Sequence, residues 1–273
     1  MGKGDIKTKR GKISNGTFGA RRKRKPNQII RNVKKECIFC GVSLMRKKES
    51  LKIQKVSKKY PERGETKDHI PQQCLFEGYP SSYKTNRLTV PSCNKCNFEF
   101  SKVENELRDL IGVANEKDDL QNVLTEKSVK SILKRKDGIQ RLEIDNTGSV
   151  KGVEFNLDKL LPSHVKNFKG IFFKTFNARF PDSFSFHVLD KKLNSNMEEL
   201  ALDFLDKNCS WKYSGHEDIF KFKIGLIKPD KTGLLVPAPN INEAVGSVCQ
   251  LVYHQRFKIS IIAFRKTILK KRI

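Results

Sequence analysis

Residues 86–97 read Asn-Arg-Leu-Thr-Val-Pro-Ser-Cys-Asn-Lys-Cys-Asn, and this stretch decides the expected fold. Its first five residues end in the β-branched pair Thr-Val, which favours a strand. Pro91 and Ser92 are typical of a helix start, so we expect a helix from there to Leu110, with Gly112 ending it. The first turns of that helix would carry Cys93, Cys96 and Asn97.

Cys93 and Cys96 form the second of two CxxC pairs, and Cys37 and Cys40 form the first. Two intervening residues place both thiolates on one tight turn facing one ion, and four thiolate ligands leave no open position. The sequence therefore predicts a structural zinc site. We expect all seven cysteines to be reduced, because no apolar secretory segment starts the chain. Two unrelated pairs of buried cysteines are the alternative.

Between the two pairs, residues 66–71 (Thr-Lys-Asp-His-Ile-Pro) predict a short strand that ends in an Asp-His pair. The order is then strand, loop, strand and helix, in which Asp-His, Asn and Cys-x-x-Cys-Asn follow one another. This pattern resembles the HNH nuclease family over roughly residues 37–112. The resemblance implies a ββα-metal finger and a metal-dependent endonuclease that hydrolyses phosphodiester bonds in DNA or RNA.

The resemblance also implies a role for each polar residue. His69 is the general base, since imidazole accepts a proton near neutral pH. Asp68 and Asn97 are ligands of a catalytic Mg²⁺ or Mn²⁺, and Asn86 orients the His69 ring. Other roles stay open: a structural one for His69, a helix or turn cap for Asn97, and a turn position for Asn86, with Asn94 as its rival.

Other residues near these motifs have less specific expectations. Cys74 shows no partner in the sequence and is expected in the core. Four basic residues could contact phosphates or lie on a solvated face: Lys67, Arg87, Lys95 and Lys102.

The charge of the chain indicates a polyanionic partner, most economically nucleic acid. The 273 residues carry a formal net charge of +25 at pH 7. Residues 1–25 hold ten Lys or Arg against the single acid Asp5, with many glycines and few apolar side chains, so this tail should be disordered by itself. We expect it to bind nucleic acid through Lys3, Lys7, Arg10, Lys12, Arg21, Arg22 and Arg24.

The tail begins with a pattern in which glycines alternate with basic residues: Met1-Gly2-Lys3-Gly4-Asp5, Lys7-Thr8, Arg10-Gly11-Lys12, Gly16-Thr17 and Gly19. This pattern resembles the small ribosomal protein Thx, although Ile13, Ser14 and Asn15 depart from it. Members of that family are short basic peptides among the RNA helices of the small ribosomal subunit. The resemblance implies that subunit as a partner, and it makes a non-catalytic zinc protein that binds rRNA the alternative to a nuclease.

The expected fold class is α+β, in four parts: the tail (1–26), the ββα zinc domain (27–115), a connecting helix and hairpin (116–155) and a C-terminal α+β domain with an antiparallel sheet (156–273). Thirteen of the 18 Phe residues and the one Trp fall in 151–273, which predicts a second packed core there. The patterns predict helices over 116–136, 163–177 and 197–204, a hairpin over 141–155, and strands over 209–214, 219–227, 245–254 and 257–264.

The remaining histidines and the hydropathy pattern add no further site. His164, His187, His216 and His254 lack a matching acid or cysteine spacing, so we expect structural or surface roles for them. No stretch approaches the roughly 20 apolar residues of a membrane span, so we expect a cytoplasmic protein without a membrane partner.

Overall fold

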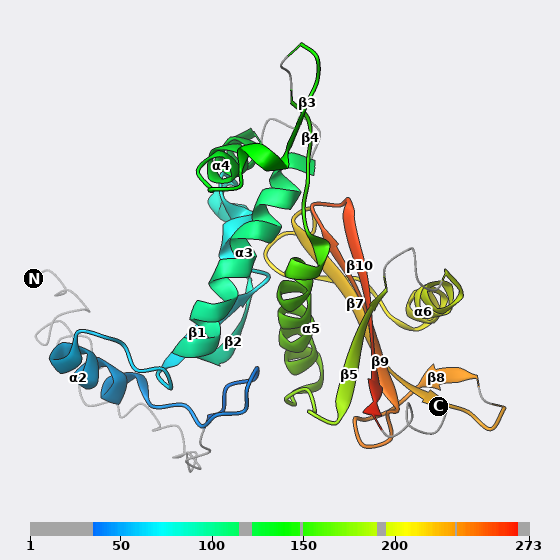
Figure 1. The fold of residues 1–273 in the computed structure, drawn as a ribbon. Helices are drawn as coiled ribbons and strands as arrows, with labels where there is room; N and C mark the ends of the chain where they lie inside the picture. The colour runs from blue at the N-terminus through cyan, green and yellow to red at the C-terminus, as the bar shows by residue number, and fades with distance from the viewer. Residues whose placement is uncertain (1–34, 115–121, 148–149, 190–194, 233, 267–273) are drawn as a thin grey trace, which may run out of the picture. The chain divides into compact units, whose positions relative to one another are not determined.

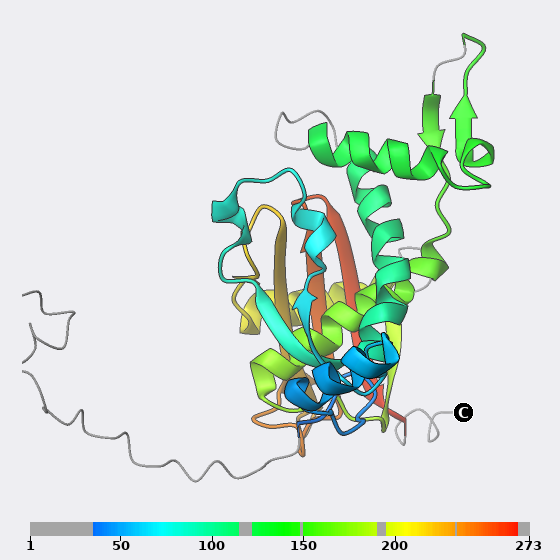
Figure 2. The ribbon, with the colours of Figure 1, turned by 90° about the vertical axis from the view of Figure 1, so that its left-hand side faces the viewer.

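We describe the protein from a computed structural model, which describes residues 35–114, 122–147, 150–189, 195–232 and 234–266 (Figures 1 and 2). The predicted tail over residues 1–26 and its basic residues lie outside this part of the chain. In the part that is described, no helix is both long and apolar enough to cross a membrane.

The central unit consists of two strands followed by a helix, in the order that the sequence predicts. After α2 (Lys47–Ser57), strand β1 (Glu65–Ile70) pairs antiparallel with β2 (Leu88–Cys93), and α3 (Asn94–Ala114) follows directly. Two short 3₁₀ turns, η1 (Gln73–Phe76) and η2 (Ser81–Lys84), lie in the connection between the strands. The register sets Asp68 opposite Val90 and His69 opposite Thr89.

Strand β2 extends further than the sequence predicts, and the helix begins at Asn94 instead of Pro91. Pro91 lies opposite Lys67 in the ladder, and its carbonyl accepts a hydrogen bond from the Ile38 N–H. Its backbone groups therefore point away from β1, so the N–H that proline lacks costs no ladder bond. As a result Cys93 is the last residue of the strand and not part of the helix.

Gly112 does not end α3, contrary to the prediction. The helix continues to Ala114, and α4 (Asn122–Leu133) packs against it at this glycine. A Cβ at Gly112 would lie 2.2 Å from the Ser128 Oγ, and the Thr125 hydroxyl donates to the Gly112 carbonyl at 2.8 Å. The glycine thus serves a close helix–helix approach, a role that a sequence pattern does not distinguish from a stop signal.

The predicted hairpin is present as β3 (Leu142–Ile144) and β4 (Val150–Val153), which pair antiparallel after the short turn η3 (Ile139–Arg141). Part of the predicted helix 116–136 lies outside the described residues, and the remainder is α4. Arg135, just beyond α4, forms ion pairs with Glu106 and Asp109 of α3. These ion pairs connect the C-terminal end of α4 to α3.

The C-terminal region forms an antiparallel sheet in the order β5-β10-β9-β7-β6, with β8 paired to the end of β7. The predicted strands over 209–214, 219–227, 245–254 and 257–264 correspond to four of these; β5 and β8 are not among the predicted ones. The bounds are β5 (Phe184–Leu189), β6 (Lys212–Tyr213), β7 (Phe220–Pro229), β8 (Leu235–Pro237), β9 (Gly246–Tyr253) and β10 (Phe257–Arg265).

Two helices cover opposite faces of this sheet (Figure 1). Helix α5 (Leu161–Phe176) follows the 3₁₀ turn η4 (Leu157–Leu160) and agrees with the predicted helix over 163–177. It starts with Pro162 in its first turn and ends at Asn177 in a left-handed conformation, as helix ends commonly do. Helix α6 (Ser195–Asn208) covers the other face.

The hydrophobic core crosses the predicted domain boundary. Phe168 and Phe172 of α5 belong to one cluster that also holds Cys37, Leu107 of α3 and Ile261 of β10. The second core predicted for residues 151–273 is therefore continuous with the first over most of its extent. A smaller separate cluster lies under α6 and contains Ala201, Phe204, Leu205, Ile227, Val248 and Ile262.

Candidate functional site

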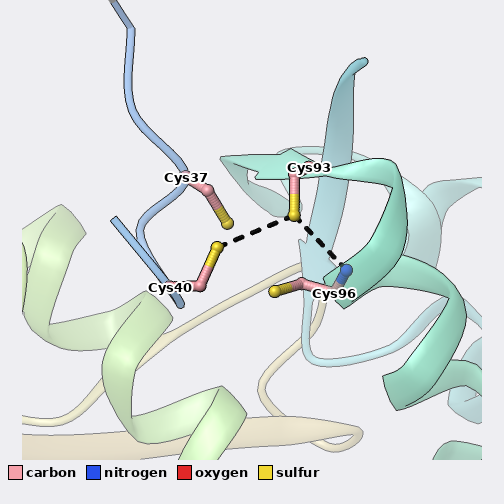
Figure 3. Close-up of side chains that lie close together, drawn as sticks. All are labelled: Cys37, Cys40, Cys93 and Cys96. Atoms are coloured by element: carbon pink, nitrogen blue, oxygen red, sulfur yellow. Dashed lines mark hydrogen bonds between the residues drawn. The ribbon is translucent and has the colours of Figure 1, made fainter. Parts of the chain in front are cut away.

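Four cysteine thiols from the two CxxC pairs converge on one point (Figure 3). Cys37 and Cys40 lie on the loop before α2, Cys93 ends β2, and Cys96 lies in the first turn of α3. Their Sγ atoms all lie within 4.8 Å of one another, and among the described residues no other group of three or more His, Cys, Asp or Glu side chains is placed to hold a metal. The arrangement is compatible with a zinc site.

The spacing of the sulfur atoms fits tetrahedral coordination. Zinc–sulfur bonds of about 2.3 Å give a tetrahedron with edges of about 3.8 Å, and the Cys40 and Cys93 Sγ atoms are 3.8 Å apart. The pKa of Cys37 is lowered to about 4, mainly because the Cys96 thiol donates a hydrogen bond to its sulfur. One thiolate therefore forms readily in this cluster, which suits metal coordination.

The first pair sits on a tight turn closed by two backbone hydrogen bonds, from the Gly41 N–H to the Cys37 carbonyl and from the Cys37 N–H to the Val42 carbonyl. Gly41 has a φ of +75°, a conformation that favours glycine, and a Cβ there would lie 2.9 Å from the Arg179 guanidinium carbon. Gly41 thus permits the tight turn that holds the first cysteine pair.

The other three cysteines are free thiols with little nucleophilic character. Burial raises the pKa of Cys74 to about 12, and it also raises the pKa values of Cys209 and Cys249. Cys74 donates weakly to the Glu104 carbonyl at 3.7 Å and is only partly buried, so it lies at the border of the core in which the sequence places it.

Asp68 lies buried on the side of β1 that faces α5, where it meets a lysine. Its Oδ1 atom is 2.7 Å from the Lys166 Nζ, and the same ammonium group also bonds the Glu104 carboxylate of α3. The Lys166 side chain is fully buried, at 0% exposure, and lies over the Phe100 ring. Burial raises the pKa values of Asp68 and Glu104, and the nearby Lys166 charge opposes that rise.

This buried group of charges leaves one oxygen without a partner. With both carboxylates ionised, Asp68, Glu104 and Lys166 sum to one negative charge. The Oδ2 atom of Asp68 is buried and accepts no hydrogen bond from the described residues. Because an unpaired buried carboxylate oxygen is costly, a cation at Oδ2 would stabilise this site.

His69 points to the other side of β1 and has a different environment. Burial lowers its pKa, the Arg87 charge lowers it further, and Asp68 acts in the opposite direction. A histidine with a lowered pKa is neutral at pH 7 and can therefore accept a proton. The side chain of His69 forms no hydrogen bond with any described residue, so its ring nitrogens are free to act on a ligand.

Arg87 is the cation that acts most strongly on His69. It is half-buried directly before β2, its Nε donates to the Lys84 carbonyl at 3.2 Å, and its guanidinium lies 5.4 Å from the centre of the Phe76 ring. Its Nη1 is buried and has no hydrogen-bond acceptor among the described residues. An anion next to His69 would supply that acceptor.

The two asparagines are less closely tied to this site. Asn97 is partly exposed in the first turn of α3, directly after Cys96. Asn86 is exposed, with a left-handed φ of 54°, in the turn before β2. Asparagine adopts this conformation more easily than most residues, so the turn accounts for Asn86 without a contact to His69.

The histidines expected to be structural show that role in two cases. His164 and His254 are buried, and their Nδ1 atoms bond the Tyr253 and Tyr79 hydroxyls at 3.1 and 3.2 Å. Burial lowers the pKa of each to about 4. His216 is partly exposed and stacks on Tyr83, and His187 is exposed on β5.

Of the basic residues near the motifs, Lys67, Lys95 and Lys102 are exposed. Sequence reasoning missed Lys166, which binds the Asp68 carboxylate, and Glu104, which binds the same ammonium group. Lys166 lies 98 positions from Asp68, and nothing in the pattern of α5 marks this lysine as buried.

Comparisons with known proteins name no relative for this chain: no family model, no curated protein and no solved structure matches it.

Proposed function

We propose that the protein is a metal-dependent nuclease of the HNH type, which hydrolyses phosphodiester bonds of nucleic acid. One juxtaposition on β1 carries this proposal: His69, with its lowered pKa and unbonded ring, directly follows Asp68, whose Oδ2 has no partner. The ββα order and the four convergent cysteines next to it support the same proposal.

Each residue of the proposed site has a chemical task. His69 takes a proton from the attacking water, and the unpaired Arg87 Nη1 binds the phosphate oxygen beside it. Asp68 Oδ2 and the Asn97 side-chain oxygen would hold a Mg²⁺ or Mn²⁺ ion, which prefers such oxygen ligands. When bound, the ion would stabilise the charge that develops on the phosphate and the leaving oxygen. Asn86 would fix the turn next to His69.

Lys166 and Glu104 act through Asp68 in this proposal. Because Lys166 holds Oδ1 from the α5 side, the carboxylate can present only Oδ2 to a metal ion. Outer groups of this kind orient metal-binding carboxylates in many sites. Zinc at Cys37, Cys40, Cys93 and Cys96 would join the loop before α2 to β2 and α3 without taking part in the reaction.

A substrate panel tests the proposal. Purified protein is incubated with plasmid, single-stranded DNA and RNA, with and without Mg²⁺ or Mn²⁺. We expect cleavage that depends on the metal, that is lost in His69→Ala, and that persists in the control His187→Ala, in which an exposed histidine of β5 is removed. Zinc content should stay near one ion per chain in both variants. Intact substrates throughout would contradict the proposal.

A second function is favoured by the basic tail, whose sequence resembles a ribosomal peptide. In this proposal the protein binds rRNA in the cytoplasm through residues 1–25, either without catalysis or as a means of delivering the nuclease to RNA. Co-sedimentation with small ribosomal subunits tests it, comparing the full chain with a version that lacks residues 1–25. Equal pelleting of the two proteins would rule out targeting by the tail.

A further inference from the structure

Two exposed aromatic residues lie at the edge of the C-terminal sheet, one directly before β6 and one at its end. Trp211 and Tyr213 have exposed fractions of 43% and 57%. Trp211 is the only tryptophan of the chain. Large rings at such exposure serve well for binding, because they supply contact area without a large loss of side-chain entropy.

Lysines of the neighbouring strand surround these rings. The register pairs Tyr213 with Lys221, and continuing it by two residues sets Trp211 opposite Lys223 on the same face. The Nζ atoms of Lys221 and Lys223 lie 5.3 and 4.8 Å from the centre of the Trp211 ring. Aromatic and basic side chains therefore alternate across two adjacent strands.

The positive charge of this surface is only partly neutralised. Lys223 pairs with Asp206 of α6 at 2.5 Å, whereas Lys221 forms no ion pair with a carboxylate in the described part of the chain. A cation beside two exposed rings can bind a phosphate while the rings stack on bases, which is how proteins hold single-stranded nucleic acid.

The end of β6 is bonded to the strand that carries His69. The Ser214 hydroxyl, next to Tyr213, donates to the Ile70 carbonyl and accepts from the Leu88 N–H, the latter at 2.9 Å. Ile70 directly follows His69. Tyr213 is therefore linked to the proposed catalytic histidine by this one hydrogen bond, because Tyr213 precedes Ser214 and Ile70 follows His69.

We infer that Trp211 and Tyr213, together with Lys221, form a platform that binds a single-stranded segment of nucleic acid by stacking. The position of this platform relative to catalysis rests on the proposed function, but stacking itself does not. Binding to the platform is therefore measured separately from cleavage.

The fluorescence of Trp211 tests the platform directly, because no other tryptophan contributes. The protein carries His69→Ala and receives no added divalent cation, so a failure of the nuclease proposal does not affect the result. It is titrated with oligo-dT and oligo-rU of about 12 nucleotides, a length within the site sizes of single-strand binders. Heparin, a polyanion without bases, serves as the control ligand.

We expect both oligonucleotides to quench Trp211, and heparin to bind without quenching. Tyr213→Ala should weaken oligonucleotide binding roughly tenfold, the usual loss for one stacked base. Trp211→Phe should bind nearly as the parent does, and Leu200→Ala, which removes an exposed apolar side chain of α6, should have no effect. Oligonucleotide binding with unchanged Trp211 fluorescence would overturn the inference, as would absence of binding or an unaffected Tyr213→Ala. Quenching by only one oligonucleotide supports it and assigns the platform to DNA or to RNA.

Discussion

The Nζ atom of Lys166 lies 2.7 Å from the Oδ1 atom of Asp68, so an ion pair joins α5 to β1 in the interior of the protein. Glu104 of α3 contacts the same ammonium group, and three elements thus meet at one charge. Helix α5 belongs to the C-terminal region, and it packs on the sheet of that region. The C-terminal region therefore fixes the position of the Asp68 carboxylate through Lys166. Through this contact it determines which carboxylate oxygen faces the candidate site.

Lys166→Met keeps much of the side-chain volume and removes the charge, which leaves Asp68 and Glu104 buried without their cation. Breaking a buried pair in this way costs about 3–5 kcal/mol, so we expect a loss of that size in the free energy of unfolding. Urea denaturation measures it, with Lys174→Met as the control, since Lys174 is exposed on the same helix. Equal stability of the two variants would show that the ion pair does not hold α5 to β1.

The packing of α5 on β1 also depends on a glycine. A Cβ at Gly170 would lie 2.4 and 2.5 Å from the Cγ1 and Cδ1 atoms of Ile70, which is fully buried. Alanine gains about 1 kcal/mol of helix propensity, but such overpacking costs about 1–3 kcal/mol and would displace the strand next to His69. We therefore expect Gly170→Ala to lose stability or the proposed nuclease activity.

Gly152→Ala is the matched control for this substitution. Its Cβ would lie 2.9 Å from the Glu143 Oε2, the end of a flexible side chain that can move away. Thermal unfolding and cleavage rates of the two variants should differ, with Gly152→Ala close to the wild type. A Gly170→Ala protein with unchanged stability and unchanged cleavage would contradict the close packing of α5 on β1.

Local patterns predict much of this fold but little of how its parts meet. The helix over 163–177, the hairpin and four strands of the C-terminal sheet follow from periodicity and turn residues. The convergence of Cys37 and Cys40 on Cys93 and Cys96 is what the spacing predicts, because one metal ion bound by both pairs would require it. The contact of Lys166 with Asp68 has no such signature, since the two residues are joined only by tertiary packing. The role of Gly112 is likewise not predictable from the local sequence, because it depends on the packing of α4 against α3.

Removal of one cysteine of the four-cysteine cluster should destabilise the protein and lower its metal content. We expect Cys40→Ser to lower the zinc content well below one ion per chain, measured by atomic emission, and to lower the midpoint of thermal unfolding. The control is Cys209→Ser, because Cys209 lies outside the four-cysteine cluster and donates to the Ile224 carbonyl. Equal zinc content in the two variants would exclude Cys40 as a ligand.

Two buried histidines predict how stability depends on pH. His164 and His254 have pKa values lowered from 6.5 to about 4 by burial, and their ring partners are the Tyr253 and Tyr79 hydroxyls, not carboxylates. Between these pH values the unfolded chain binds protons that the folded protein excludes. Stability is therefore complete above pH 6.5 and falls as the pH decreases to about 4, by about 1.4 kcal/mol per pH unit for each histidine.

Substitution of both histidines should remove this part of the pH dependence. Asparagine suits both positions, because its amide can bond the same hydroxyls and because His254 has a φ of 46°, which asparagine tolerates. Urea denaturation across this pH range should give a steeper loss of stability for the wild type than for His164→Asn/His254→Asn. His187→Asn, on the exposed side of β5, should retain the wild-type slope. If the double variant keeps the full slope, the acid sensitivity originates in groups other than these two histidines. Asp68 and Glu104 would not account for it, because their raised pKa values favour the folded state as the pH falls.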